Sequence, residues 1–103
     1  MDTINIYQTS LFTNQKKKLK KNQIQDLDKA IKRVIDNPAI GQQKKGDLES
    51  IFVYKFSMVN QQYLLAYTWD QKARTFIAIG VHENFYRDLK KADVSRTKVS
   101  YSA

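Results

Sequence analysis

The stretch SIFVYKFSMVNQQYLLAYTWDQKARTFIAIGV (residues 50–81) decides the fold of this chain. Apolar and aromatic residues alternate with other residues in three runs, 50–59, 62–69 and 74–81, and this pattern predicts three β-strands. Asn60-Gln61 and residues 70–73 separate the runs and are short enough for hairpin turns. Consecutive strands joined by hairpins run antiparallel, so the sequence predicts an antiparallel sheet.

One face of this sheet carries most of its large apolar side chains. Side chains alternate between the two faces of a strand, so one face receives Phe52, Tyr54, Phe56, Met58, Tyr63, Leu65, Tyr67 and Trp69, and we expect it to form the core. The other face presents Val53, Lys55, Ser57, Leu64 and Ala66. Lys55 is there either as a charge that protects a sheet edge from aggregation or as part of a functional concave surface.

The residues before the sheet predict a strand and two helices. Residues 3–8 alternate like a short, half-buried strand. Ser10 can cap a helix that runs to about Lys20, and Asn22 with Gln25 resembles a capping box for a second helix. That helix has apolar residues at helical spacing and ends at Asn37-Pro38; they are Ile24, Leu27, Ala30, Ile31, Val34 and Ile35.

A last short helix is predicted from Glu83 to about Ala92, followed by a polar tail that is either disordered or a frayed strand. The order is therefore β-α-α-β-β-β-α. The fold class is α+β, with an N-terminal strand, a helical hairpin packed on an antiparallel sheet and a short C-terminal helix. We expect one domain over residues 1–92 and a tail over residues 93–103.

Composition narrows the class of protein. The chain has 103 residues, no cysteine and a net charge of +8. Residues 1–45 carry ten Lys and Arg against four Asp, and residues 87–103 carry five against two. Two basic segments around a neutral middle favour a polyanion or an acidic protein as partner, although a solvated basic surface is the alternative. No secretion signal or membrane span is evident, so we expect a cytoplasmic protein.

Three segments carry a resemblance to a known family: NPAIGQQKKGDLESIFVYKF (37–56), QQYLLAYTW (61–69) and FIAIGVHENFYRDLK (76–90). Together with the order of elements and the basic hairpin, they resemble the RelE/ParE superfamily, the toxins of bacterial type II toxin-antitoxin modules. The resemblance covers roughly residues 3–91. It implies a cognate antitoxin as partner, whose extended segment wraps the toxin.

The resemblance implies two different activities. RelE-like toxins are metal-independent endoribonucleases that cut mRNA on the ribosome, and ParE-like toxins inhibit DNA gyrase without a known nuclease site. Lys55 matches a catalytic lysine of the RelE-like toxins. His82 follows the glycine that ends the last strand, where they carry an arginine or another polar catalytic group. Tyr86 lies about two residues short of their C-terminal tyrosine, and Leu64 stands where they have a phosphate-binding arginine.

The role of the single histidine, His82, can be interpreted in two ways. His82 is the side chain whose ordinary pKa lies near neutrality, and with Glu83 it could serve acid-base chemistry. Alternatively, His82 or Asn84 caps the helix that follows. We expect His82 to be functional, with Lys55 and Tyr86 as its companions, because Tyr86 falls on the same side of the helix four residues later.

The basic residues are either a solvated surface or phosphate contacts. We expect RNA contacts from the run KKKLKK (16–21) and from cations nearer His82; the set is Lys16, Lys17, Lys20, Lys21, Lys44, Lys45, Arg87, Lys90 and Lys91. Lys44, Lys45 or Arg87 could replace the missing arginine. No spacing indicates a metal site or another cofactor. The sequence favours a ribosome-dependent endoribonuclease toxin; the alternatives are a gyrase inhibitor and an inactive member that acts only with its antitoxin in operon autoregulation.

Overall fold

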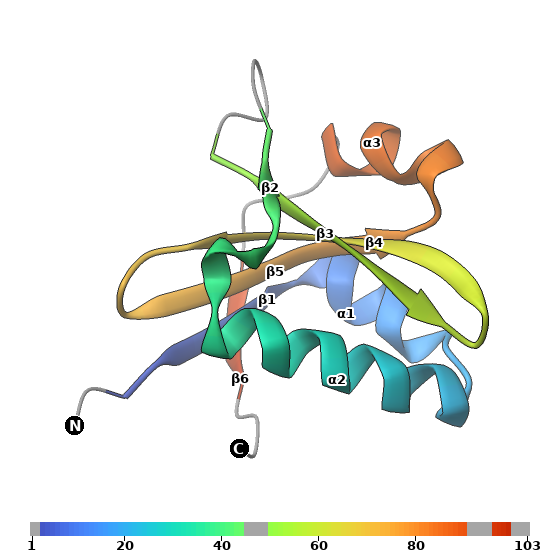
Figure 1. Cartoon of the computed structure of the whole chain (residues 1–103). Coiled ribbons are helices and arrows are strands. Elements are labelled where there is room, and N and C mark those ends of the chain that lie inside the picture. Colours follow the sequence, from blue (N-terminus) through green and yellow to red (C-terminus); the bar gives the residue numbers. More distant parts are fainter. Residues whose placement is uncertain (1–2, 45–49, 91–95, 100–103) are drawn as a thin grey trace.

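A six-stranded sheet forms the centre of the molecule (Figure 1). The computed structural model describes residues 3–44, 50–90 and 96–99. The strand order is β2-β3-β4-β5-β1-β6. The strands are β1 (Asn5–Thr9), β2 (Gln42–Gln43), β3 (Phe52–Met58), β4 (Gln61–Trp69), β5 (Ala73–Gly80) and β6 (Arg96–Val99). The antiparallel β3-β4-β5 core of this sheet confirms the three predicted strands, with ends that differ by one or two residues.

Helices cover both faces of the sheet. The helices are α1 (Ser10–Lys17), α2 (Lys21–Asp36), the 3₁₀ turn η1 (Pro38–Ile40) and α3 (His82–Lys90). In Figure 1, α1 and α2 lie below the sheet and α3 lies above it. The predicted α+β class, with a helical hairpin on the sheet and a short C-terminal helix, is confirmed.

The predicted core face packs against the hairpin. Tyr67, Phe76 and Leu65 of the sheet are fully buried with Phe12 of α1 and Leu27 of α2. The other face has a smaller core of its own, in which Phe85 and Leu89 of α3 pack on four sheet residues: Val53, Leu64, Ala66 and Ala78. Because both faces are apolar at the centre, the sheet is a middle layer between two helical layers.

The β3-β4 hairpin turns one residue earlier than predicted. Met58 pairs with Gln61, so Val59 and Asn60 form the two-residue turn, and the expected Asn60-Gln61 turn is wrong. Both residues have positive φ, 47° for Val59 and 67° for Asn60, as a type I′ turn requires. A β-branched residue is rarely found there, and this is why Val59 gave no turn signal.

The caps at the starts of α1 and α2, the helices of the helical hairpin, also differ from the sequence prediction. Thr9, not Ser10, caps α1: its Oγ1 accepts a hydrogen bond from the Phe12 backbone N–H at 3.1 Å. In α2 the helix begins at Lys21, and the Gln23 side chain accepts from the Lys20 backbone N–H at 2.9 Å. The predicted capping box at Asn22 is therefore wrong by two residues.

The N-terminal strand joins the sheet in parallel to β5. Where β1 ends, side chains continue the pairing with β5: the Thr9 hydroxyl donates to the Ile77 carbonyl at 2.7 Å, and Gln15 Oε1 accepts from the Ile79 N–H at 2.8 Å. The other edge of β1 pairs with β6, so residues 96–99 of the polar tail form a strand.

A buried tyrosine fixes the chain between α2 and β2. Tyr67 has no exposed surface; its hydroxyl donates to the Pro38 carbonyl at 2.7 Å and accepts from the Gly41 N–H at 2.9 Å. Burial raises the pKa of this phenol above its ordinary value, partly offset by the hydrogen bond from Gly41. A Cβ on Gly41 would overlap the hydroxyl oxygen, so glycine permits this close approach.

Candidate functional site

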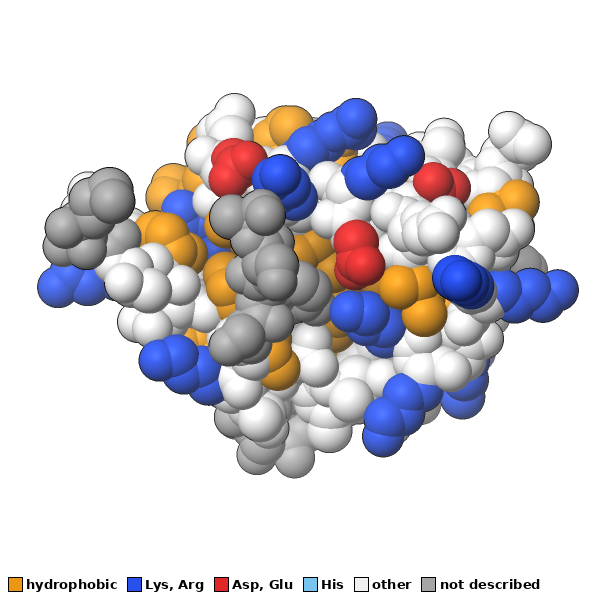
Figure 2. Space-filling view, turned by 90° about the horizontal axis from the view of Figure 1, so that it is seen from below, with side chains coloured by type: hydrophobic (Ala, Val, Ile, Leu, Met, Phe, Trp, Pro, Cys, Tyr) orange, Lys and Arg blue, Asp and Glu red, His pale blue; other side chains and the backbone are white. Residues whose placement is uncertain are grey.

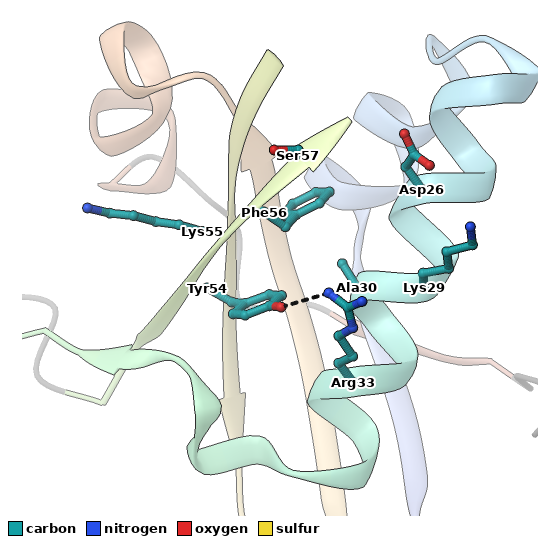
Figure 3. A pocket seen from close by; sticks show the side chains of 8 residues that line it. All are labelled: Asp26, Lys29, Ala30, Arg33, Tyr54, Lys55, Phe56 and Ser57. Carbon is teal, nitrogen blue, oxygen red and sulfur yellow. Dashed lines mark hydrogen bonds between the residues drawn. The ribbon is translucent and has the colours of Figure 1, made fainter. Parts of the chain in front are cut away.

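Three of the residues selected from the sequence, Lys55, His82 and Tyr86, lie on the side of the sheet that carries α3. Lys55 of β3 pairs with Leu64 of β4, and Leu64 pairs with Gly80 of β5. Residues paired in this way point to the same face, and Leu64 packs in the core beneath α3. Lys55 therefore points to the α3 side, and Figure 3 shows its side chain directed away from α2. It is exposed.

His82 and Tyr86 lie against each other at the start of α3. Their ring centroids are 5.6 Å apart and the rings meet edge to face. This contact confirms that the spacing of four residues places them on one side of the helix. His82 is exposed, whereas Tyr86 is half-buried and its other neighbour is Phe85, at 5.1 Å.

Nothing in the described residues assigns His82 to helix capping. No hydrogen bond of its imidazole is found among them. Asn84, the other capping candidate, instead accepts a hydrogen bond from Arg87 Nη2 at 3.1 Å. The Phe85 N–H donates to the Val81 carbonyl at 3.2 Å, so a hydrogen bond between backbone groups closes the first turn of α3.

Lys44 is the cation that the fold adds to this pair. Its Nζ lies 5.5 Å from the centroid of the Tyr86 ring, a cation-π distance. The end of β2 holds it there, because the Lys44 N–H donates to the Ile51 carbonyl at 2.8 Å. Lys44, one of the three candidates to replace the missing arginine, therefore contacts Tyr86.

The arginine position is buried in this chain, whereas the cations on α3 are exposed. Leu64 is 2% exposed and packs under α3, so this position supplies no cation to the site. Arg87 is exposed and bonds to Asn84 on α3. Lys90 is exposed at the end of the same helix. Lys45 and Lys91 lie outside the described residues, as does the side chain of Glu83.

The lysines of the KKKLKK run lie on the other side of the sheet. They belong to the end of α1 and the start of α2, the layer opposite α3 (Figure 1). Lys16 is 3.6 Å from Asp28 in an ion pair, and Lys17, Lys20 and Lys21 are exposed. Figure 2 shows this face from below, with Lys and Arg side chains spread over it and Asp side chains among them. The run is thus separate from His82 and Tyr86.

A groove that the sequence prediction missed lies between α2 and β3 (Figure 3). It has a volume of about 340 Å³ and is lined by Asp26, Lys29, Ala30, Arg33, Tyr54, Lys55, Phe56 and Ser57. Arg33 Nη1 donates to the Tyr54 hydroxyl at 3.3 Å across it. The sequence signal was weak, because Lys29 and Arg33 look like ordinary exposed residues on the polar side of a helix.

The α3 face offers the His82 imidazole, the Tyr86 ring and the ammonium groups of Lys44 and Lys55. Within residues 3–44, 50–90 and 96–99 no three His, Cys, Asp or Glu residues are grouped as metal ligands. The same part of the chain contains no helix with the length and apolarity to span a bilayer.

Comparison with known proteins places the chain in a family. Residues 6–90 match the family model described as the ParE-like toxin of type II bacterial toxin-antitoxin systems. The chain belongs to this family. The resemblance to RelE/ParE toxins is thereby confirmed, and membership implies a cognate antitoxin as partner.

A solved structure supports the fold of this toxin. It is a mutant of the E. coli toxin RelE, with two arginines replaced by alanine, in the free state. The match covers 88% of this chain and 93% of that chain at 19% sequence identity, with a TM-score of 0.65. At this identity the likeness concerns the fold. No match was found among curated proteins.

Proposed function

We propose that this toxin is a ribosome-dependent endoribonuclease that cuts mRNA in the cytoplasm without a metal ion. The observation that carries the proposal is the cluster of His82, Tyr86 and Lys44 on the face toward which Lys55 points. An RNA backbone needs cations at its phosphates, and an aromatic ring gives an unpaired base a surface for stacking. The cluster offers both beside an imidazole.

Each side chain has a role in this reaction. His82 accepts the proton of the ribose 2′-OH as that oxygen attacks the adjacent phosphorus. The bond to the 5′-oxygen of the next nucleotide breaks, which leaves a 2′,3′-cyclic phosphate and a 5′-oxygen that takes a proton from water. Lys55 stabilises the negative charge that builds on the phosphate oxygens. Lys44 binds the phosphate in place of the arginine that Leu64 replaces. Tyr86 positions the base, and its contact with His82 orients the imidazole.

Inhibition of DNA gyrase is the second candidate. It is favoured by the burial of Leu64 under α3, which leaves the α3 face without a cation at the arginine position. The family description, a ParE-like toxin, points the same way. A third possibility, an inactive member that works only with its antitoxin in operon autoregulation, predicts that the free toxin has no effect on growth.

Brief expression of the toxin in growing cells separates these functions. We expect growth arrest, mapped cuts within translated mRNA and unchanged plasmid supercoiling. Relaxed or broken plasmid DNA with intact mRNA would instead establish the gyrase inhibitor. The control is Lys72→Gln, which removes an exposed cation from the β4-β5 turn and leaves His82, Tyr86 and Lys44 in place; we expect it to keep the cleavage.

A further inference from the structure

The connection from the end of α2 to Lys44, residues 37–44, passes around one edge of the sheet. It begins below the sheet with α2 and η1 and continues as β2, the strand at that edge (Figure 1). It ends on the α3 side, where the Lys44 ammonium group lies over the ring of Tyr86. This connection therefore links the core on the hairpin side to the candidate site on the other side.

The connection has few contacts of its own. No side chain of residues 37–44 is buried: Ile40 is 41% exposed, and both residues of β2 are exposed. The pairing of β2 with β3 covers two residues, and so short a two-stranded contact is marginal by itself. The position of the connection must therefore be fixed at another point.

Tyr67 provides that point. Its hydroxyl donates to the Pro38 carbonyl at 2.7 Å and accepts from the Gly41 N–H at 2.9 Å, so it holds the connection at two places three residues apart. The ring itself is fully buried, with the Phe52 and Phe76 ring centroids 5.9 and 6.3 Å away. Because a close-packed core does not yield easily, the hydroxyl is a rigid anchor.

The anchor at Gly41 lies three residues before Lys44. The two residues of β2 stand between them, and the Lys44 N–H then donates to the Ile51 carbonyl at 2.8 Å. The Lys44 side chain is half-buried, with its Nζ 5.5 Å from the centroid of Tyr86, and that ring lies 5.6 Å from His82. A shift of the connection at Gly41 would therefore move the ammonium group away from both rings.

We propose that Tyr67 is a positioning residue for the candidate site: its hydroxyl, on the hairpin side of the sheet, determines where Lys44 lies against Tyr86 on the α3 side. Tyr67 belongs to the core on the hairpin side, and Tyr86 packs on the core under α3, so the hydroxyl acts on the site through the connection. The benefit of this position for RNA cleavage rests on the proposed function; the placement of Lys44 by Tyr67 does not.

NMR of the free, full-length toxin measures the position of Lys44 without a nuclease assay. The ring current of Tyr86 should shift the Lys44 ε-CH₂ protons upfield in wild type, and Tyr86→Leu gives their position without the ring. We expect Tyr67→Phe to move these signals most of the way to the Tyr86→Leu position. The control Leu27→Val removes a buried methylene from α2, destabilises the same core and should leave the Lys44 signals in place.

Cleavage of ribosome-bound mRNA then tests whether the position matters for the reaction. We expect Tyr67→Phe to lower the rate of the first turnover about 10- to 100-fold, since a small misplacement caused far from the chemistry can cost that much. In a Lys44→Gln background the same substitution should lower it less than about twofold further, because no ammonium group is left to position. A purely structural role for Tyr67 predicts instead that the two losses multiply.

A second variant reaches the same contact from the other side. Gly41→Ala keeps Tyr67 but adds a Cβ that would overlap its hydroxyl oxygen, so it should displace the Lys44 signals as well, and it serves if Tyr67→Phe does not fold. Lys44 signals that stay in place in these variants, or that move equally in Leu27→Val, would overturn the proposal. So would rate losses that multiply. If wild type leaves mRNA intact, the proposed function fails, whereas the NMR result still decides whether Tyr67 places Lys44.

Discussion

Replacing Tyr67 with phenylalanine tests how the chain between α2 and the candidate site is held. The substitution keeps the buried ring and removes the hydroxyl, so the Gly41 N–H and the Pro38 carbonyl lose their partner. Each hydrogen bond contributes about 1 kcal/mol net, and the cost rises when a group is left unpaired. We expect the free energy of unfolding to fall by about 2 kcal/mol and the melting temperature by about 8–16 °C.

The loss should depend on pH. The unfolded phenol ionises near its ordinary pKa of 10.0, whereas the pKa of folded Tyr67 is raised. Above that ordinary value the unfolded state of the wild type has released a proton that the folded state retains, so its stability falls as pH rises toward the folded pKa. Phenylalanine has no such proton. The stability difference between the two proteins should therefore be largest near pH 7 and shrink above pH 10.

Urea denaturation of both proteins between pH 7 and pH 11 measures this difference. Tyr54→Phe is the matched control, since that hydroxyl takes part in one exposed hydrogen bond of 3.3 Å and its loss should cost little. Gly41→Ala should destabilise the wild type, and less so in the Tyr67→Phe background, where the overlapping oxygen is gone. A Tyr67→Phe protein as stable as wild type at pH 7, or a pH-independent difference, would refute the reasoning.

Three further substitutions test other parts of the structure. Val59→Asn should raise the melting temperature by about 4–8 °C, because asparagine tolerates the positive φ that costs valine about 1 kcal/mol or more; a lower melting temperature would contradict the strained turn. Gln15→Leu should cost about 1–3 kcal/mol by leaving the Ile79 N–H unpaired, and Gln15→Glu, which keeps the acceptor, should cost less in the same denaturation assay. Replacing four lysines of the helical hairpin with glutamine should flatten the salt dependence of ribosome binding without changing stability; the four are Lys16, Lys17, Lys20 and Lys21. Unchanged binding at matched salt would show that this face is only solvated.

The sequence predicted the elements because its periodicities are clear. Strand alternation and the helical spacing of Leu27, Ala30, Ile31 and Val34 identified one buried layer correctly. The sequence did not predict the second core under α3, because this core combines the sparse apolar residues of the other sheet face with Phe85 and Leu89, which follow later in the chain. Turn and cap positions shifted by one or two residues, since neighbouring polar residues offer equivalent signals and tertiary contacts choose among them.

The candidate site was only partly visible in the sequence. The contact of His82 with Tyr86 follows from helical spacing, and the side of the sheet for Lys55 follows from strand alternation. The contact of Lys44 with Tyr86 joins distant parts of the chain, so residue spacing did not predict it. The groove depends on β2 being only two residues long, and a sequence does not state where a strand stops pairing.

Cleavage of a defined mRNA on purified ribosomes tests the proposed activity most directly. The rate of the first turnover would be measured for wild type, His82→Gln and the control Lys72→Gln, after equal melting temperatures have shown that all three proteins are folded. We predict metal-independent cleavage by wild type, near wild-type cleavage by Lys72→Gln, and a rate about 10² to 10⁴ lower for His82→Gln. Ribosome-bound mRNA that stays intact with wild type, or is cut equally well by His82→Gln, would contradict a nuclease site on the α3 face.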